Sequence, residues 1–457
     1  MMLSTPPVTN SRFLRTTTLQ DLLQHVADAQ SASIVGVSNM GKSALLRDLC
    51  RPQVRNSLMP GLAESVHCFY IDCNRMLDQS EHAFYELILR VFLAELKEDD
   101  PGLLDSIRSA YETLLNPPSN FHVPLSFNQA LTTLIETYGR RSVLVFDEFD
   151  AAFETLNPRT FLNLRALKDR HGPALTYVIA TDRRLSHIRS GEFVDEFKEL
   201  FAMRTHYIGP LSEEETRDFI AHRIQALNAS FDDNDIRFLW AQAGGHPTLT
   251  EIACRHLAAV TGEVQRSDTE DWLIHREVRN ILREDMSVTL ECEKIWRDLT
   301  LEEQAFLSGL FRAETIHDPQ TRNELLHKGL LRKQEGDLIP FCDLFRYFVQ
   351  RRSAVKVGLS KGVRVDAETG EVTVDGKPVE TLTRLEFRLL LLLYGHLNKI
   401  CDKYSIVEAV WGEEYVDEVY DSSIEKLVSR LRRKIEPDPS NPRYLLTVRG
   451  RGYKLVG

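Results

Sequence analysis

"SIVGVSNMGKSALLRDLC", residues 33–50, decides the fold of this 457-residue chain. A short apolar run comes first, the pattern G-x-x-x-x-G-K-[ST] follows at 36–43, and a helical pattern completes the stretch. Glycines let the loop backbone curl until its amides point inward, and the positive end of the helix dipole adds to them. A strand, a loop and a helix in this order predict a polyphosphate site, although a glycine loop taken alone could be a structural turn.

The predicted nucleotide-binding residues of this loop are Gly36, Val37, Ser38, Asn39, Met40, Gly41, Lys42, Ser43 and Ala44. Lys42 is expected to reach the β- and γ-phosphates, and Ser43 to hold Mg²⁺. In "VLVFDEFD" (143–150) a buried strand ends in two acids, so that Asp147 would serve the metal and Glu148 would polarise an attacking water. The pattern predicts ATP or ADP and Mg²⁺ as cofactors, with slow hydrolysis serving a switch; Asp-Glu by itself is more often a solvated turn.

Two further positions are candidates for the same site. Arg183 follows the apolar run at 175–181, where a neighbouring strand would deliver it to the γ-phosphate, or it is an ordinary surface arginine. "GGHP" at 244–247 opens a helix; His246 and Pro247 either approach the nucleotide or form a simple turn with proline in the first helical turn.

Short apolar runs at 33–37, 66–73, 142–147 and 175–181 alternate with helical patterns, which predicts a parallel sheet with helices on both faces. Helical patterns alone fill 212–300, and helices with one hairpin fill 301–352. We predict a multidomain protein: an α/β P-loop NTPase with a helical lid and an internal winged helix, followed by a C-terminal α+β winged-helix domain. The expected divisions are an ATPase core at 10–210, the lid at 211–300, the internal unit at 301–352, a linker at 353–361 and the C-terminal domain at 362–457.

Composition narrows the class of protein. Seven cysteines without a C-x-x-C pair argue against a disulfide framework or a zinc site and favour a reducing compartment. The start of the chain lacks the layout of a signal peptide, and the longest apolar run, at 389–394, falls far short of the about 20 residues that span a bilayer. A cytoplasmic protein without a membrane segment is expected.

Charge is segregated near the end of the chain. The net charge is -11, yet residues 358–457 hold 16 basic and 16 acidic side chains. Residues 404–425 carry seven acids and no base, and 426–457 carry nine bases against two acids. Such segregation predicts two different partners, because a local basic patch and not the total charge decides polyanion binding.

The stretch 421–435 predicts a helix with an apolar stripe on one face and a polar face opposite. Two strands joined by Gly450-Arg451-Gly452 follow it, and two amphipathic helices precede it, which together make a winged helix. The polar face and the turn of the hairpin supply candidate contacts to double-stranded DNA: Ser422, Lys426, Ser429, Arg430, Arg433 and Arg451. A solvated surface helix is the alternative.

Two resemblances carry these predictions further. "GVSNMGKS", "LVFDEFD", "VIATDR", "GPLSEEE" and "GGHP" resemble, in this order, the STAND-type ATPases, a branch of the AAA+ P-loop proteins. That resemblance implies roles for Asp147 in Mg²⁺ binding, Glu148 in hydrolysis, Arg183 in sensing the γ-phosphate, and His246 and Pro247 against the nucleotide. It also implies a switch that ADP holds closed and ATP opens, often with self-association.

"VRVDAETGEVTVDG", "VWG", "SRLRRKI" and "RYLLTVRGRGYKL" resemble the OmpR/PhoB-type winged-helix domain over 358–457. The resemblance implies DNA contacts for Arg430, Arg432, Thr447, Arg449 and Tyr453. The chain departs from that family at Leu427 and Ser422, where His and a basic residue are frequent, so some phosphate contacts differ. The acidic loop around 411–420 faces RNA polymerase in that family, or here it merely caps a helix.

Together the motifs predict a bacterial transcription regulator whose ATP/ADP state controls DNA binding. An AAA+ motor or replication-initiator-like ATPase is the first alternative, and DNA-stimulated turnover would distinguish it. A signalling or defence switch whose winged helix docks protein is the second.

Overall fold

The computed structural model describes residues 15–456 except for 97–100, 140, 228, 264–270, 312–317, 335, 359–361, 366–371, 376, 381, 412–420 and 449. The chain forms two compact units, Met1–Phe348 and Val349–Gly457. Each unit has its own hydrophobic core, as expected when a chain is too long for a single core.

A five-stranded parallel sheet lies at the centre of the first unit. Its strands are β1 (Ala32–Val35), β2 (Val66–Asp72), β3 (Arg141–Asp147), β4 (Leu175–Thr181) and β5 (Thr205–Tyr207). They are arranged in the order β2-β3-β4-β1-β5. The four strands expected from apolar runs are confirmed. The edge strand β5 was not predicted, because its three residues are polar and only half-buried.

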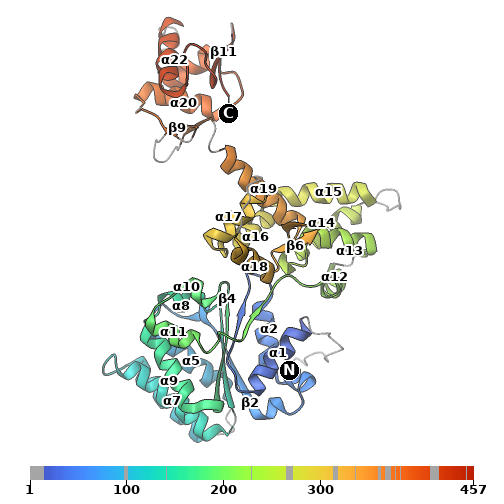
Figure 1. Cartoon of the computed structure of the whole chain (residues 1–457), viewed down its shortest axis with the longest axis vertical. Helices are drawn as coiled ribbons and strands as arrows, with labels where there is room; N and C mark the ends of the chain where they lie inside the picture. The colour runs from blue at the N-terminus through green and yellow to red at the C-terminus, as the bar shows by residue number, and fades with distance from the viewer. Residues whose placement is uncertain are drawn as a thin grey trace, which may run out of the picture. The chain divides into compact units, whose positions relative to one another are not determined.

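Helices cover both faces of this sheet. Figure 1 shows α5, α7 and α9 on one side of the strands and α1 and α2 on the other. The core helices are α1 (Thr16–Ala27), α2 (Lys42–Cys50), α3 (Pro52–Leu58), α4 (Leu62–Ser65), α5 (Glu81–Glu95), α6 (Pro101–Leu115), α7 (His122–Tyr138), α8 (Asp150–Thr155), α9 (Pro158–His171), α10 (Leu185–Ile188) and α11 (Glu192–Lys198), with 3₁₀ turns at Cys73–Arg75 and Gly172–Ala174. The continuous burial of β3 and β4 follows from this double cover and explains their unbroken apolar sequence.

A segment of helices with one hairpin follows the sheet and spans both the expected lid and the expected internal unit. Its elements are α12 (Glu213–Leu227), α13 (Asp233–Ala243), α14 (Pro247–Glu263), α15 (Asp271–Glu284), α16 (Met286–Arg297), α17 (Leu301–Gly309), α18 (Pro319–His327), β6 (Leu331–Gln334), β7 (Asp337–Pro340) and α19 (Asp343–Gly358). The predicted hairpin is confirmed, since β6 and β7 pair antiparallel. Helix α19 continues to Gly358, so helix covers the first part of the stretch expected as a linker. The finer domain boundaries stay predictions.

Local sequence explains where α17 starts. At α17, the Thr300 side chain accepts from the backbone N–H of Glu303, and the Glu303 carboxylate accepts from the N–H of Thr300, which forms a capping box. The same carboxylate also accepts from the buried ammonium of Lys328, 2.8 Å away, on the segment after α18. The Glu303 carboxylate thereby fixes the start of α17 to the residue that follows α18.

The second unit contains the helices and sheets of a winged helix. Its elements are β8 (Val363–Val365), β9 (Val372–Val374), β10 (Lys377–Pro378), α20 (Arg384–Gly395), α21 (Lys403–Val410), α22 (Asp421–Ile435), β11 (Leu445–Val448) and β12 (Gly452–Leu455). The predicted apolar stripe of α22 is confirmed as core. Gly452 is required at the hairpin, because a Cβ there would lie 2.1 Å from the carbonyl oxygen of Cys401 and its φ is +128°.

Candidate functional site

The loop between β1 and α2 has the backbone that its glycines predict. Gly36 passes so close to the first turn after β5 that a Cβ would lie 2.5 Å from the carbonyl oxygen of Ile208. Gly41 has φ +96° and caps α2, and Asn39 adopts a left-handed conformation at φ +60°. Of the predicted loop residues, Gly36 to Gly41 lie in the turn, and Lys42, Ser43 and Ala44 form the first turn of α2. The site opens at the carboxyl end of β1, where the winding of the sheet reverses.

Lys42 is buried, and its ammonium has three hydrogen-bond acceptors. Its side chain is 4 % exposed, and its ammonium donates to the carbonyl oxygens of Gly36 at 2.6 Å and Val37 at 3.3 Å. It also donates to Asp182, 2.5 Å away at the end of β4. Burial lowers the pKa of Lys42, but the Asp182 carboxylate outweighs this and raises it overall. A buried cation needs such a partner, since an unpaired one would be strongly destabilising.

The two acids that end β3 differ in their surroundings. Asp147 is 1 % exposed and accepts from the Tyr70 hydroxyl at 2.5 Å and from the backbone N–H of Glu148 at 3.0 Å. Glu148 is half-buried with φ +52°, a strained conformation for a non-glycine residue that is typical of functional sites. Burial raises the pKa of the Glu148 carboxyl, which favours a role in proton transfer. Tyr70 was not predicted; its apolar-strand sequence context gave no signal.

A further carboxyl completes the acidic end of the sheet. Asp150, in the first turn of α8, accepts from the backbone N–H of Asp182 at 2.9 Å. Burial and the neighbouring Asp182 raise the pKa of Asp150 to about 7. The oxygen donors here, the Ser43 hydroxyl and the Asp147 carboxylate, suit Mg²⁺, which usually takes one or two carboxylates and completes its shell with water and phosphate. Among the described residues, no group of three or more His, Cys, Asp and Glu side chains could hold a metal ion.

His246 lies fully buried between the lid and the loop. Its Nδ1 accepts from the backbone N–H of Leu249 at 3.4 Å, and its ring contacts the backbone of Ser38. Burial lowers the pKa of His246 to about 4, so the ring is neutral at physiological pH. Pro247 begins α14, as expected of a proline in the first helical turn. The structure thus places His246 beside the loop.

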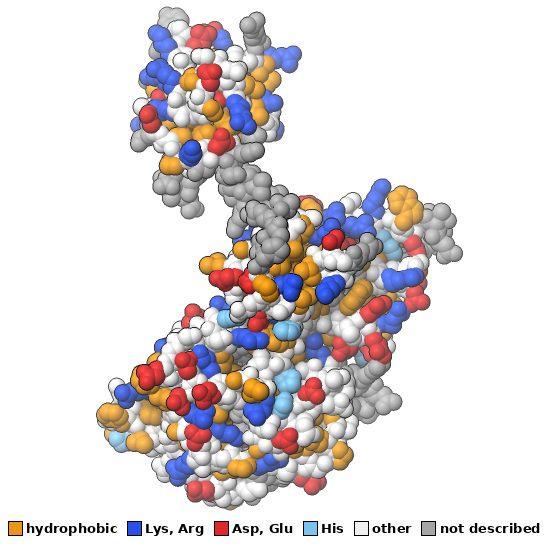
Figure 2. Space-filling model, in the orientation of Figure 1, with side chains coloured by type: hydrophobic (Ala, Val, Ile, Leu, Met, Phe, Trp, Pro, Cys, Tyr) orange, Lys and Arg blue, Asp and Glu red, His pale blue; other side chains and the backbone are white. Residues whose placement is uncertain are grey.

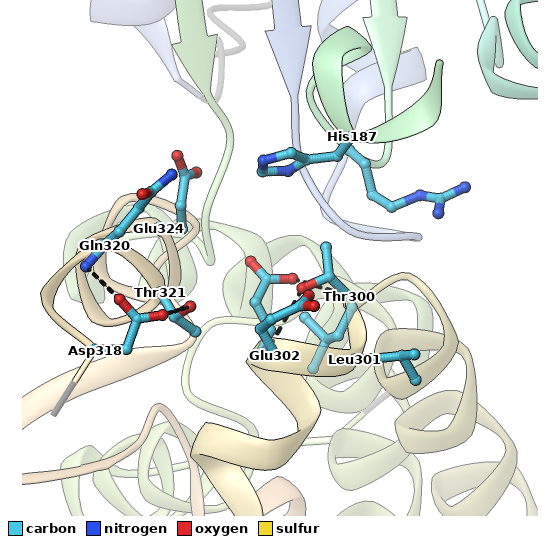
Figure 3. Close-up of a pocket in the computed structure, with 11 residues that line it drawn as sticks. His187, Thr300, Leu301, Glu302, Asp318, Gln320, Thr321 and Glu324 are labelled. Carbon is cyan, nitrogen blue, oxygen red and sulfur yellow. Dashed lines mark hydrogen bonds between the residues drawn. The ribbon is translucent and has the colours of Figure 1, made fainter. Parts of the chain in front are cut away.

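Arg183 lies across a pocket from the start of the internal unit. The pocket has a volume of about 530 Å³ and is lined by Arg183 and His187 from the core, by Thr300 at the end of the lid, and by Glu302, Asp318 and Glu324 of the internal unit. Figure 3 shows His187 on one side and the ends of α17 and α18 on the other. The Arg183 guanidinium and several carboxylates therefore line the same pocket from opposite walls.

Two lid acids, neither of them expected, touch the loop itself. The backbone N–H of Ser38 donates to the Asp298 carboxylate at 2.6 Å, and the side-chain amide of Asn39 donates to Glu291 at 2.7 Å. Arg15 reaches the opposite side of the loop and donates to the carbonyl oxygens of Met40 and Gly209, both at 2.6 Å. No local sequence signal marks these residues, because they belong to other helices and meet the loop only in the folded chain.

The candidate DNA contacts of α22 divide by exposure. Ser422, Lys426, Ser429, Arg430 and Arg433 are exposed, and so are Thr447 and Arg451 of the hairpin. Figure 2 shows Lys and Arg side chains interspersed with Asp and Glu on the visible face of this unit.

The remaining candidates have other surroundings. Arg432 donates to the carbonyl oxygen of Leu445 at 2.6 Å and to the Thr447 hydroxyl at 2.8 Å, so it ties α22 to the hairpin. Tyr453 is only 5 % exposed and belongs to the core, which leaves little of it for DNA. Arg449 and the acidic loop at 412–420 lie outside the described residues. All the DNA contacts stay predictions.

Sequence comparisons agree with this arrangement in two parts. Residues 9–353 match the family model "Novel STAND NTPase 1", and residues 376–455 match "Transcriptional regulatory protein, C terminal". Within the residues that the structure describes, no helix is both long and apolar enough to cross a membrane.

Curated relatives match about a fifth to a quarter of the chain. The sensory transduction protein RegX3 of Mycolicibacterium smegmatis is 43% identical over 95 residues, which are 21% of this chain and 40% of that protein. The uncharacterized transcriptional regulatory protein YcbL of Bacillus subtilis is 36% identical over 110 residues, 24% of this chain and 47% of that protein. The chain spans less than half the length of these relatives.

Solved structures show weaker likeness. The Walker-type ATPase paby2304 of Pyrococcus abyssi matches 76% of this chain and 98% of its own at 11% identity and a TM-score of 0.43. The DNA-binding domain of CpxR from E. coli matches 21% of this chain and 91% of its own at 32% identity and a TM-score of 0.18.

The first family model covers far more than half of the chain, and its range contains the loop, the acidic strand ends and the lid described above. The chain therefore belongs to the novel STAND NTPase 1 family, and its C-terminal part is a winged-helix domain of the OmpR/PhoB type.

Proposed function

We propose that this protein is a transcription regulator in which ATP or ADP, bound at residues 36–44, controls DNA binding by the C-terminal winged helix. The observation that carries the proposal is the pair of contacts from the lid to the loop. Ser38 and Asn39 bind lid carboxylates directly, so occupancy of the loop by phosphate must change how the lid is held.

The residues of the site have separable roles in this proposal. Lys42 would turn from Asp182 toward the phosphates, and the inward amides of the loop would bind their oxygens. Mg²⁺, held by Ser43 and Asp147, would neutralise phosphate charge. Glu148 would orient the attacking water and accept its proton, a step favoured by its raised pKa.

The C-terminal unit would bind the DNA in this proposal. Lys426, Arg430 and Arg433 form an exposed basic face on α22, while the opposite face is buried in the core. A helix of this kind enters the major groove, and the adjacent hairpin carries Arg451 to the backbone or the minor groove. Because one module covers only a short half-site, we further propose that the ATP-bound chain self-associates and pairs two C-terminal units on DNA.

Selection of bound DNA fragments by the full chain, without nucleotide, with ADP and with a non-hydrolysable ATP analogue, tests the proposal. We expect a defined DNA motif whose affinity differs at least about tenfold between the two nucleotides. Lys42→Met should bind the motif equally in all three conditions, and Arg430→Ala should lose DNA while still binding nucleotide. Identical affinity of the unaltered protein in all conditions would refute the switch.

Glu148→Gln separates switching from turnover. This variant should keep nucleotide binding and reduce hydrolysis by at least about a hundredfold, because it removes the proton acceptor and keeps the shape. Hydrolysis that DNA accelerates strongly, without a nucleotide effect on DNA affinity, would instead indicate a DNA-dependent motor.

A further inference from the structure

Two carboxylates of one lid segment occupy donors of the phosphate-binding loop. Glu291 lies on α16, and Asp298 follows its last residue, seven positions later. That spacing is two helical turns, so both side chains point from the same face of the segment. Asp298 accepts from the Ser38 N–H at 2.6 Å, and Glu291 accepts from the Asn39 amide at 2.7 Å.

The chemistry of these contacts imitates that of a phosphate. A carboxylate offers anionic oxygens to N–H donors, as a phosphate does, and such charge-assisted bonds are shorter and stronger than neutral ones. The Ser38 amide belongs to the loop whose backbone is shaped for anions, and the nearby Lys42 ammonium also attracts the Asp298 carboxylate. An anion of the protein itself therefore uses part of the site that a nucleotide would need.

Glu291 connects this segment to the rest of the lid. Its carboxylate is 3 % exposed, and besides Asn39 it faces Lys294 at 3.1 Å and the His246 ring at 3.7 Å. It is thus held by Lys294 of α16 and by Asn39 of the loop, with the neutral His246 ring beside it. Burial and the neighbouring Asp182 carboxylate raise the pKa of Asp298, so the protein disfavours its charged form relative to water.

We propose that Asp298, supported by Glu291, is an autoinhibitory latch that competes with nucleotide phosphate for the loop. This inference rests on the proposed nucleotide binding and names how that site is regulated. Displacement of Asp298 frees the segment that leads through Leu299 into α17. That segment also forms one wall of the pocket opposite Arg183, so release of the latch is transmitted to the internal winged-helix unit.

The test uses the full chain with Asp298→Ala, and Glu284→Ala as a matched control. Glu284 is an exposed acid at the end of α15, so both variants lose one negative charge from the lid. We expect Asp298→Ala to bind a fluorescent ADP analogue about tenfold more tightly than the unaltered protein, and Glu284→Ala to bind it unchanged. Asp298→Asn, which keeps a neutral acceptor for the Ser38 amide, should fall between them.

Hydrogen exchange measured by mass spectrometry supplies a second test, which needs no nucleotide. Peptides covering α16 and the start of α17 should exchange faster in Asp298→Ala than in the unaltered protein, and ADP should produce the same change in the unaltered protein. Equal or weaker ADP binding by Asp298→Ala would overturn the latch.

Failure of every protein to bind nucleotide would refute the proposed function instead, and the latch with it as a regulator of nucleotide. In that case the rate of hydrogen exchange in α16, compared between Asp298→Ala and the unaltered protein without ligand, would still show whether Asp298 holds the lid on the loop.

Discussion

Replacing Lys42 with methionine should destabilise the protein even when no nucleotide is present. The ammonium of Lys42 lies 2.5 Å from Asp182, and it also satisfies the carbonyl oxygens of Gly36 and Val37. Methionine keeps the length and apolar volume of the side chain, so the change isolates the charge. Asp182 would then remain near the carboxylates of Asp150 and Asp298 without its cation.

The expected loss follows from the burial of the pair. Removing one partner of a buried ion pair costs about 3–5 kcal/mol, and we take about 3 kcal/mol because Asp182 is 21 % exposed and water screens part of the charge. For a unit of 348 residues, an unfolding entropy of about 2.1 cal/mol/K per residue converts this loss into a midpoint about 4 °C lower.

Scanning calorimetry of the full chain without nucleotide measures this midpoint for the first unit. Lys333→Met, which removes an exposed lysine of β6, is the control and should shift it by less than about 1 °C. Combining Lys42→Met with Asp182→Asn should restore part of the loss, because the double variant buries no unpaired carboxylate. An unchanged midpoint in Lys42→Met would show that the buried ion pair with Asp182 does not stabilise the fold, and it would refute this reasoning.

Three other predictions concern the turn before α14 and the helix α22. The pKa of His246 is lowered to about 4 by burial, so the unfolded chain takes up a proton below about pH 6.5 while the folded one does not until about pH 4. The free energy of unfolding should therefore decrease as the pH is lowered through that window. Between pH 7 and pH 4.5, urea titrations should show that the unaltered protein loses about 2 kcal/mol more of this free energy than His246→Gln does. Gly245→Ala should lower the thermal midpoint by an amount corresponding to about 3 kcal/mol, because φ is +83° and the new Cβ would lie 2.2 Å from the carbonyl oxygen of Leu211. The control is Gly262→Ala, in an open helical position, which should be neutral or stabilising. Lys426→Ala should weaken DNA binding about equally on all sequences and reduce the slope of log affinity against log salt by about 1, and an unchanged slope would remove Lys426 from the phosphate contacts.

The sequence predicted those parts of the fold that local pattern controls. Continuous apolar runs located β1 to β4, because strands buried on both faces cannot alternate, and the spacing of apolar residues located α22. The strand β5 was missed, since its register against β1 and not its composition makes it a strand. Burial of Tyr453 was also missed, because the tyrosine lies in a hairpin whose neighbouring residues are basic.

By itself the sequence determined the loop at 36–43, the acids that end β3 and the basic face of α22, because each depends on residues within one turn or strand of one another. The tertiary structure alone decided what faces the loop. Ser38 and Asp298 are 260 positions apart, and only the return of the lid onto the carboxyl end of β1 brings that carboxylate to the amide. Such a contact arises from how helices pack over long chain separations, and no periodicity or local motif encodes it.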